Sequence, residues 1–281
     1  MEKQALVQLR RKKVLRGACR RHPLLHQDPR SAGQMFILEK RKILYCSVPK
    51  TGSTNWKRIF MVLEGVRPNL QNISSYEAHY SNGFKVLPHS GLLRQIRELD
   101  SYTKFLQVRH PFARLISAYR NKISGEIPWN WQEERFQQIA LYIARKYRKG
   151  AHAGWFNLTT LRVSWDEWVR YLTDPAERSG FNSHWREMYK LCLPCRVQYD
   201  LIGKLESVDS DLSFLLDHLG LEHILFPSIR PLYHREDEKT GNALIRQYFG
   251  NMSQRDLQRL YKIYQLDFEI FGFEKPGLLN F

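Results

Sequence analysis

The sequence predicts an α/β fold in which a central parallel sheet is flanked by helices. Short apolar runs typical of buried strands alternate with longer runs in which apolar residues recur at helical spacing. The first pair is a strand over Ile43–Val48 and a helix over Thr54–Leu63, and the second is a strand over Lys104–Val108 and a helix over Phe112–Ile123. Strands that alternate with helices form parallel sheets covered on both faces, so we expect one such sheet here.

The rest of the chain is predicted to be mostly helical. A helix is expected over Trp131–Arg148, and the next helix begins at Ser164, where Glu167 three residues later completes a capping box. A short strand over residues 199–206 is followed by a helix over Asp209–Leu219 that ends at Gly220. The last expected helix covers Ser253–Leu266.

We expect a single catalytic domain over residues 36–281, preceded by a basic, stem-like segment over residues 1–35. Pro23, Pro29 and Gly33 break any helix in that segment before the first strand. With 281 residues, 43% of them hydrophobic, the chain can bury a large core without metals or crosslinks. It has no run of about 18 apolar residues and no apolar leader, so no transmembrane span or signal peptide is expected within it.

The charge balance points to an anionic partner. The chain has 44 Lys and Arg residues against 28 Asp and Glu residues, which gives a net charge of +16. Net charge does not distinguish nucleic acid, an acidic membrane, an anionic polysaccharide and a phosphorylated cofactor.

Four cysteines, Cys19, Cys46, Cys192 and Cys195, allow one or two disulfides in an oxidising compartment. The segment "CLPC" also resembles half of a zinc site or a redox pair, but no second ligand pair completes it, so structural cysteines are favoured and their pairing stays open. Sequons at Asn72, Asn157 and Asn251 favour a secretory route.

The loop "PKTGST" after the first strand is suited to holding a phosphate. A strand, a tight turn and a helix N-terminus direct backbone N–H groups and the positive end of the helix dipole at one point. Gly52 permits close approach of a ligand, and Lys50 adds a mobile positive charge. The loop lacks the nucleotide-triphosphatase pattern G-x-x-x-x-G-K-[ST], and a plain polar turn is the alternative interpretation.

A second anion-binding element is predicted at the end of the second strand. In "YTKFLQVRHPFARLISAYR", Arg109 ends that strand, Pro111 starts a helix, and Ser117 lies two turns further on. A parallel neighbouring strand would bring Arg109 and Ser117 near the Lys50 loop, where they would fit a second phosphate of the same nucleotide. Taken alone, Arg109 is better explained as a surface ion-pair partner.

Together, "VPKTGSTNWKR" and "VRHPFARLISAYR" resemble the 5'-phosphosulfate and 3'-phosphate motifs of sulfotransferases. The resemblance continues through "NSHW", "LCLPCRVQYDLIGKLES" and "YKIYQLDFEIFGFEKP", which are similar to the Golgi carbohydrate sulfotransferases of the HNK-1 and chondroitin/dermatan 4-O group. It covers roughly Lys40–Pro276. It departs from many relatives at His110, where an acidic residue is usual, and at Ser53, where cysteine is common.

The resemblance implies a P-loop nucleotide-kinase-like sulfotransferase fold and transfer of a sulfuryl group from 3'-phosphoadenosine 5'-phosphosulfate (PAPS) to a sugar hydroxyl. The residues that would line the 5'-phosphosulfate are Lys50, Thr51, Gly52, Ser53, Thr54 and Asn55. Arg109 and Ser117 would hold the 3'-phosphate. Lys50 would also stabilise the leaving phosphate, and the cations and backbone donors make a metal unnecessary.

A general base is expected opposite the leaving group, because a sugar hydroxyl is a poor nucleophile. His79 in "AHYSN" is the first candidate, because this segment resembles the region that holds the catalytic histidine of related sulfotransferases. His184 is the second candidate, with substrate binding beside Trp185 or a structural role as its alternatives, and His89 has no motif. For any one histidine, an ordinary surface or core position is the competing interpretation.

The expected acceptor is an anionic glycan, with position 4 of N-acetylgalactosamine in chondroitin or dermatan first and position 3 of terminal glucuronic acid next. Relatives are Golgi type II membrane proteins, so a Golgi luminal location is implied, with an anchor that this chain lacks. No nucleic-acid partner is expected. A nucleotide kinase, which would need magnesium and ATP, and a polyanion-binding module are the alternative functions.

Overall fold

The computed structural model describes residues 2–26, 33–88, 90–127, 134–148, 158, 160–221 and 242–277. They form two compact units, which are described separately. The first unit comprises Met1–His110, Arg186–Glu238 and Leu266–Glu274, and the second comprises Pro111–Trp185, Lys239–Gln265 and Lys275–Phe281.

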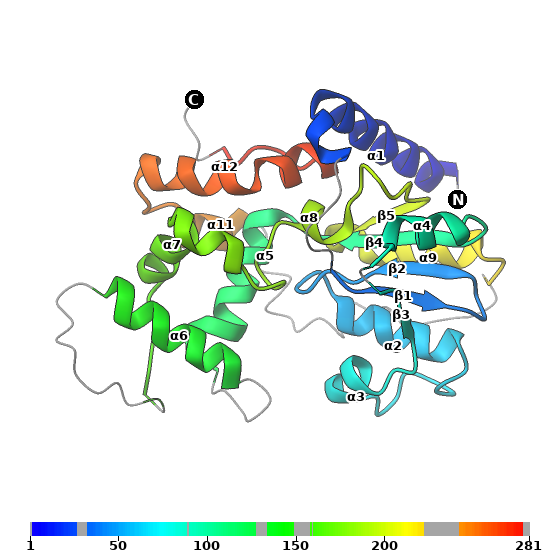
Figure 1. Ribbon diagram of the computed structural model, residues 1–281, viewed down its shortest axis with the longest axis horizontal. Helices are drawn as coiled ribbons and strands as arrows, with labels where there is room; N and C mark the ends of the chain where they lie inside the picture. Colours follow the sequence, from blue (N-terminus) through cyan, green and yellow to red (C-terminus); the bar gives the residue numbers. More distant parts are fainter. Residues whose placement is uncertain are drawn as a thin grey trace. The chain divides into compact units, whose positions relative to one another are not determined.

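The first unit is built on a five-stranded sheet with strand order β3-β1-β2-β4-β5 (Figure 1). Its strands are β1 (Met35–Leu38), β2 (Ile43–Cys46), β3 (Lys85–Val86), β4 (Thr103–Val108) and β5 (Leu201–Lys204). Strands β2, β4 and β5 are parallel, whereas β1 is antiparallel to both of its neighbours.

The α/β class is confirmed, but the sheet is mixed rather than wholly parallel. Only four residues, between Leu38 and Ile43, connect β1 to β2. One of them, Lys42, has a φ of 50°. Such a short connection forms a hairpin, because a parallel neighbour requires a crossover of a dozen residues or more. The alternation of strands and helices predicted β2, β4 and β5 and missed this hairpin.

Helices cover both faces of the sheet. The helices of the first unit are α1 (Glu2–Arg21), α2 (Ser53–Leu63), α3 (Ser75–Tyr80), α4 (Leu92–Glu98), α8 (Met188–Cys192) and α9 (Val208–His218), with short 3-10 turns η1 (Pro23–His26) and η5 (Leu205–Ser207). One core joins α2 and α9 to one face of the sheet, through residues such as Trp56, Phe105 and Leu212. The other core joins α1, α4 and α8 to the opposite face, through residues such as Leu15, Leu106 and Ile96.

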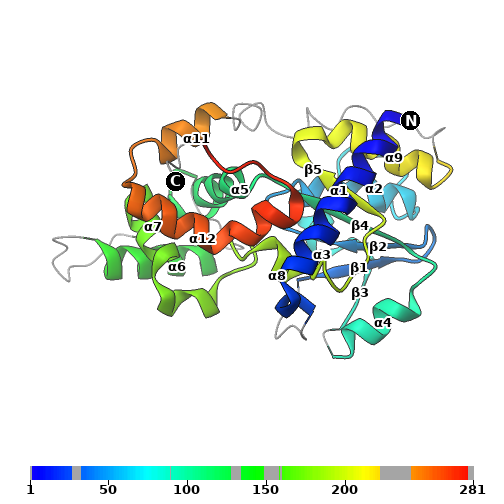
Figure 2. The same cartoon turned by 90° about the horizontal axis from the view of Figure 1, so that it is seen from above.

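The basic N-terminal segment forms the helix α1, which lies against the sheet (Figures 1 and 2). Leu15, Ala18 and Cys19 are buried in the core of this face. In the middle of the helix, Arg11 forms an ion pair with Asp211 of α9 at 2.7 Å. The helix is therefore packed into the first unit, and the domain boundary at residue 35 stays a prediction.

The second unit is helical in its described part. Its elements are α5 (Pro111–Ala118), the π-helical turn η2 (Tyr119–Ile123), α6 (Glu134–Tyr147), α7 (Trp165–Thr173), the 3-10 helix η4 (Pro175–Gly180), α11 (Asn242–Phe249) and the first part of α12 (Gln254–Phe271). The capping box at Ser164 is present as predicted, because the Ser164 side chain accepts from the Glu167 N–H and the Glu167 carboxylate accepts from the Ser164 N–H.

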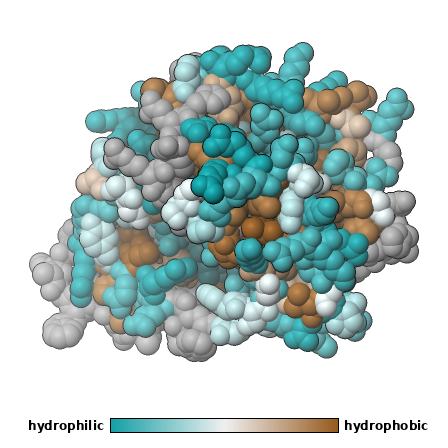
Figure 3. Space-filling view, turned by 45° about the vertical axis from the view of Figure 1, so that its right-hand side comes forward, coloured by the Kyte–Doolittle hydropathy of each residue, from teal (hydrophilic) through white to brown (hydrophobic). Residues whose placement is uncertain are grey.

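The face drawn in Figure 3 is covered mostly by hydrophilic residues, with apolar residues in separate patches. None of the helices in the described ranges is long and apolar enough to cross a membrane.

Candidate active site

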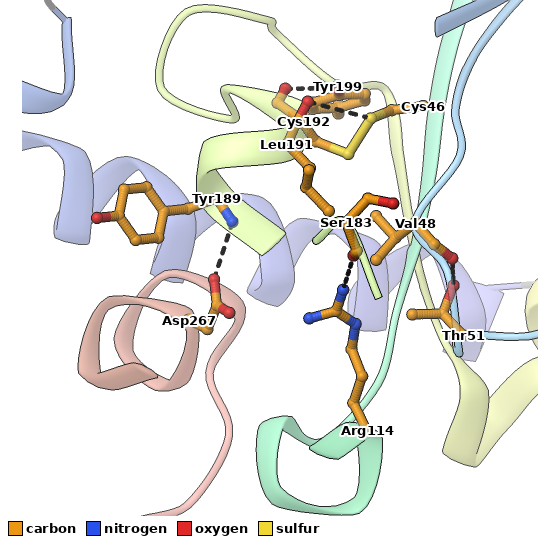
Figure 4. Close-up of a disulfide and its surroundings, with 10 residues drawn as sticks. All are labelled: Cys46, Val48, Thr51, Arg114, Ser183, Tyr189, Leu191, Cys192, Tyr199 and Asp267. Carbon is orange, nitrogen blue, oxygen red and sulfur yellow. Dashed lines mark hydrogen bonds between the residues drawn. A yellow bond between two sulfur atoms is a disulfide. The ribbon is translucent and has the colours of Figure 1, made fainter. Parts of the chain in front are cut away.

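The candidate site is built around the loop that joins β2 to α2. Lys50 has a φ of 71° and Gly52 a φ of 83°, so two residues adopt the left-handed region within one turn. The hydroxyl of Thr51 donates to the carbonyl of Val48 at 2.8 Å, which folds the loop back on itself (Figure 4). At Gly52, the N-cap of α2, a side chain would strain the backbone.

The loop ends in the first turn of α2, which is suited to an anion. The first N–H groups of a helix have no acceptor within that helix, and the helix dipole places partial positive charge there. Ser53 and Asn55 in this turn are buried, whereas Gly52 and Thr54 are half-buried. The side-chain oxygen of Asn55 accepts from Arg58 at 2.8 Å, so Asn55 helps to hold the Arg58 guanidinium in place.

Arg109 reaches this loop from the neighbouring strand. It follows β4, which pairs in parallel with β2, so both strands end at the same edge of the sheet. The guanidinium donates to the carbonyl of Lys50 at 3.2 Å and is almost fully buried. Arg109 of the second motif therefore meets Lys50 of the first motif within the first unit.

Ser117 lies in α5 and is half-buried. It belongs to the second unit, whereas Arg109 belongs to the first. The predicted approach of Ser117 to the Lys50 loop stays a prediction.

His79 lies in α3, and both of its ring nitrogens contact α2. Its Nε2 is 3.0 Å from the hydroxyl of Thr54, and its Nδ1 is 3.2 Å from the ammonium nitrogen of Lys57. The N-cap of α3 is Ser74, whose side chain accepts from the N–H of Glu77. The structure therefore brings His79 to Thr54, directly after the Lys50 loop.

Lys57 is a candidate residue that the sequence interpretation missed. It is 2% exposed, and its ammonium group lies over the ring of Phe36 on β1. Burial lowers the pKa of Lys57 to about 8. Within the described residues no carboxylate forms an ion pair with it. The only sequence signal was its position, one helical turn after Thr54 on the same face.

The two contacts couple the protonation of Lys57 to the tautomer of His79. A protonated Lys57 donates to Nδ1, so a neutral imidazole then carries its proton on Nε2. A neutral Lys57 can accept from Nδ1–H, which leaves a lone pair on Nε2 beside Thr54. Only the second arrangement lets Nε2 accept a proton.

His110, which follows Arg109, is neutral at physiological pH. Burial, assisted by Arg109 and Lys204, lowers the pKa of its imidazole to about 4. Its ring meets Phe268 and Phe273 edge to face, and its backbone N–H donates to the carboxylate of Glu206 at 2.8 Å. At this position the protein therefore presents an apolar-packed, uncharged ring.

The other histidine and tryptophan candidates do not belong to the described part of the first unit. His184 and Trp185 belong to the second unit; the Nδ1 of His184 is 2.7 Å from the side-chain oxygen of Asn182. Trp185 is fully buried against Trp168 and Phe136. The ring is part of a core in this structure, and its contact with a substrate stays a prediction. His89 lies outside the described residues.

All four cysteines form disulfides. Cys19 pairs with Cys195, and Cys46 pairs with Cys192 (Figure 4). The structural interpretation is confirmed, and the zinc and redox interpretations of "CLPC" are wrong, because its two cysteines bond to different distant partners. Cys46 is the last residue of β2, so its disulfide anchors the strand directly before the loop. No cluster of His, Cys, Asp and Glu residues suited to a metal occurs in the described part of the chain.

Comparison with known proteins agrees with this geometry. The model of the sulfotransferase family matches residues 33–274, which include the Lys50 loop, His79 and Arg109. This chain belongs to the sulfotransferase family. The resemblance in the motifs is thereby confirmed.

The relatives that match this chain include carbohydrate sulfotransferases. Carbohydrate sulfotransferase 8 of Mus musculus is 33% identical over 276 residues, which are 96% of this chain and 64% of that protein. Carbohydrate sulfotransferase 9 of Homo sapiens is 34% identical over 249 residues, 88% of this chain and 55% of that protein. Carbohydrate sulfotransferase 11 of Mus musculus is 34% identical over 261 residues, 90% of this chain and 70% of that protein. The chain thus spans less than two thirds of the length of the first two, and no solved structure matches it.

Proposed function

We propose that this protein transfers the sulfuryl group of PAPS to a hydroxyl of an anionic glycan. The preferred acceptor is position 4 of N-acetylgalactosamine in chondroitin or dermatan, with position 3 of terminal glucuronic acid as the alternative. Membership of the sulfotransferase family and relatives named as carbohydrate sulfotransferases support the reaction class. The net charge of +16 suits a polyanionic acceptor.

The observation that carries the proposal is the contact of Arg109 with the carbonyl of Lys50. This contact joins the loop that would hold the 5'-phosphosulfate of PAPS to the strand end that would hold its 3'-phosphate. Residues 50–55 would bind the 5'-phosphosulfate, and Arg109 would bind the 3'-phosphate together with Ser117. The planar, permanently charged guanidinium of Arg109 is of the type that forms charge-assisted hydrogen bonds with a phosphate.

The transfer itself breaks the bond between sulfur and the phosphate oxygen of PAPS and forms a bond between sulfur and the sugar oxygen. The electron pair of the broken bond leaves with 3'-phosphoadenosine 5'-phosphate. Lys50 and the N–H groups of the loop would stabilise the negative charge that develops on its 5'-phosphate. The proton of the sugar hydroxyl would pass to Nε2 of His79, in the arrangement where Lys57 is neutral. The reaction is then balanced without a metal.

The compartment we propose is the Golgi lumen. Two disulfides fit an oxidising environment. Asn72 and Asn251, which begin two of the three sequons, are exposed as glycosylation requires. The third sequon residue, Asn157, lies outside the described residues.

The test is transfer of radiolabelled sulfate from PAPS to desulfated chondroitin, dermatan, heparan and glucuronyl-lactosamine acceptors. We expect label on one acceptor, and a loss of at least a hundredfold in kcat/KM for Arg109→Ala and for His79→Ala, because each removes a charge-stabilising or proton-accepting group. PAPS binding should weaken in Arg109→Ala but not in His79→Ala.

The matched control is Arg94→Ala, which removes an exposed arginine of α4 whose ion-pair partner among the described residues is Glu98 of the same helix. It should retain full transfer. If the unmutated protein neither binds PAPS nor labels any acceptor, the proposal is wrong. Magnesium-dependent ATP binding in its place would favour a nucleotide kinase.

A further inference from the structure

A groove in the first unit lies between α1 and the segment that follows α8. Its volume is about 420 Å³, and three cations of α1 line it: Lys12, Arg16 and Arg20. Pro194 and Gln198 lie on the opposite wall. Neither the motifs nor the transfer chemistry assigns a role to this groove.

The three cations form a regular row. They are spaced four residues apart on one helix, so successive side chains are about 6 Å apart along the helix axis. Arg16 and Arg20 are exposed, and Lys12 is half-buried. In the described ranges of the chain, no carboxylate forms an ion pair with any of them. A row of this kind matches charges repeated along an extended chain better than one compact anion.

The row is held rigidly against the rest of the unit. The disulfide from Cys19 to Cys195 joins the two walls of the groove. In the middle of α1, Arg11 donates to the carbonyl of Ile202 and pairs with Asp211. The cations are therefore carried on a fixed helix, and a ligand does not have to order a flexible segment to engage them.

The groove is separate from the Lys50 loop. The residues of α1 beside it, Leu15 and Cys19, pack on the sheet face of α4 and α8. The helix α2, which starts from the loop, packs on the opposite face. None of residues 50–55 lines the groove, and neither Arg109 nor His79 does, so the groove does not belong to the donor site.

We propose that this groove is an exosite that binds an anionic glycan chain, at carboxylate or sulfate groups away from the sugar that is sulfated. A concave site with a wall at Pro194 and Gln198 suits a single chain better than a flat membrane surface. The two disulfides fit the oxidising compartment where such glycans occur, and nucleic acids are not expected there. The proposal goes beyond the transfer reaction and does not need it.

The test measures binding of a fluorescently labelled chondroitin sulfate oligosaccharide to the full chain, without PAPS, by fluorescence anisotropy at several salt concentrations. The combined variant Lys12→Ala, Arg16→Ala and Arg20→Ala should raise Kd at least tenfold and reduce its dependence on salt, because fewer ions are displaced. In transfer assays, the same variant should raise KM for a long acceptor and leave kcat for a short one unchanged.

The matched control is Lys3→Ala, Arg10→Ala and Lys13→Ala, which removes the same charge from exposed residues of α1 that do not line the groove. It should change Kd by less than threefold. Circular dichroism and thermal unfolding confirm that both proteins fold, and the charge reversal Arg16→Glu gives a second variant with a single substitution.

Equal losses in the two combined variants would overturn the proposal, because the binding would then follow net charge alone. Unchanged binding in the groove variant would overturn it too. So would tighter binding to vesicles of anionic phospholipid, or to a single-stranded oligonucleotide, than to the oligosaccharide. If the unmutated protein binds the oligosaccharide but does not transfer sulfate, that result would count against the proposed reaction and not against the exosite.

Discussion

At the scale of single residues, the contact between Lys57 and His79 has the strongest consequence for chemistry. Lys57 is buried without a carboxylate partner among the described residues, and burial lowers its pKa to about 8. Its ammonium nitrogen is 3.2 Å from Nδ1 of His79. Among the described residues, His79 is the one titratable side chain within hydrogen-bond distance of Lys57. The ammonium group of Lys57 lies over the ring of Phe36 on β1. We therefore regard Lys57 as a positioning residue for the proposed base.

The sign of the expected pH dependence follows from the tautomers. Above pH 8 Lys57 is mostly neutral and can accept from Nδ1–H, so Nε2 is able to take the acceptor's proton. We expect kcat to rise through a pH near 8 in the unmutated protein. In Lys57→Met that rise should disappear, and kcat at pH 8.5 should fall about tenfold or more. The measurement is a pH–rate profile at saturating PAPS.

Lys57→Arg gives the control for this prediction. Arginine keeps the positive charge but does not lose its proton in this range, so it should hold the unproductive tautomer and remain slow at every pH tested. A rise near pH 8 that persists in Lys57→Met would show that another group titrates there. Thermal unfolding of both variants checks that the buried position tolerates them.

At the scale of elements, one carboxylate holds three of them together. Asp211 of α9 accepts from Gln8 and Arg11 of α1 and from the backbone N–H of Lys204 in β5. The hydroxyl of Ser207 donates to it as well. The side chain of Asp211 is 1% exposed, so its carboxylate has lost its contacts with water. These donors supply hydrogen bonds in place of that water.

Asp211→Asn should destabilise the first unit, because the substitution leaves the buried Arg11 without its counter-charge. We expect a loss of about 3 kcal/mol in the free energy of unfolding, measured with chemical denaturant. Asp217→Asn, on the exposed side of the same helix, should change it by less than about 0.5 kcal/mol. Equal effects of the two substitutions would contradict the role of Asp211 as an anchor.

At the scale of the whole molecule, two disulfides connect parts of the chain that are far apart in sequence. Cys19 and Cys195 are separated by 176 residues, and Cys46 and Cys192 by 146. Both tie the segment around α8 to the first 50 residues of the chain, one at α1 and one at the end of β2. The Cys19–Cys195 bond holds the two walls of the groove together. The Cys46–Cys192 bond holds the strand that leads into the Lys50 loop.

Removal of either disulfide by paired Cys→Ser substitutions should lower the free energy of unfolding by about 2–5 kcal/mol, as expected for closing long loops. The two variants should differ in ligand binding. Loss of the Cys46–Cys192 bond should weaken PAPS binding, whereas loss of the Cys19–Cys195 bond should weaken binding of the oligosaccharide. Calorimetric titration with each ligand tests this, and an identical effect of both variants on both ligands would contradict it.

The sequence by itself determined the α/β class, the two strand–helix pairs that carry the site, and the family. These follow from local signals: apolar runs of strand length, the glycine and hydroxyl residues of the Lys50 loop, and an arginine at the end of the next strand. Two strands that end at one edge of a parallel sheet bring such residues together, so the meeting of Arg109 with Lys50 could be predicted.

Only the tertiary structure decided the antiparallel hairpin of β1 and β2, the pairing of the cysteines and the contact of Lys57 with His79. Each depends on which distant segments pack together, and no local pattern encodes that choice. Trp185 shows the same limit, because an aromatic side chain suits both a sugar and a core, and its burial against Trp168 gives it the core position here. Local residue chemistry thus predicted which segments form the candidate site, and long-range packing decided which side chains lie beside it.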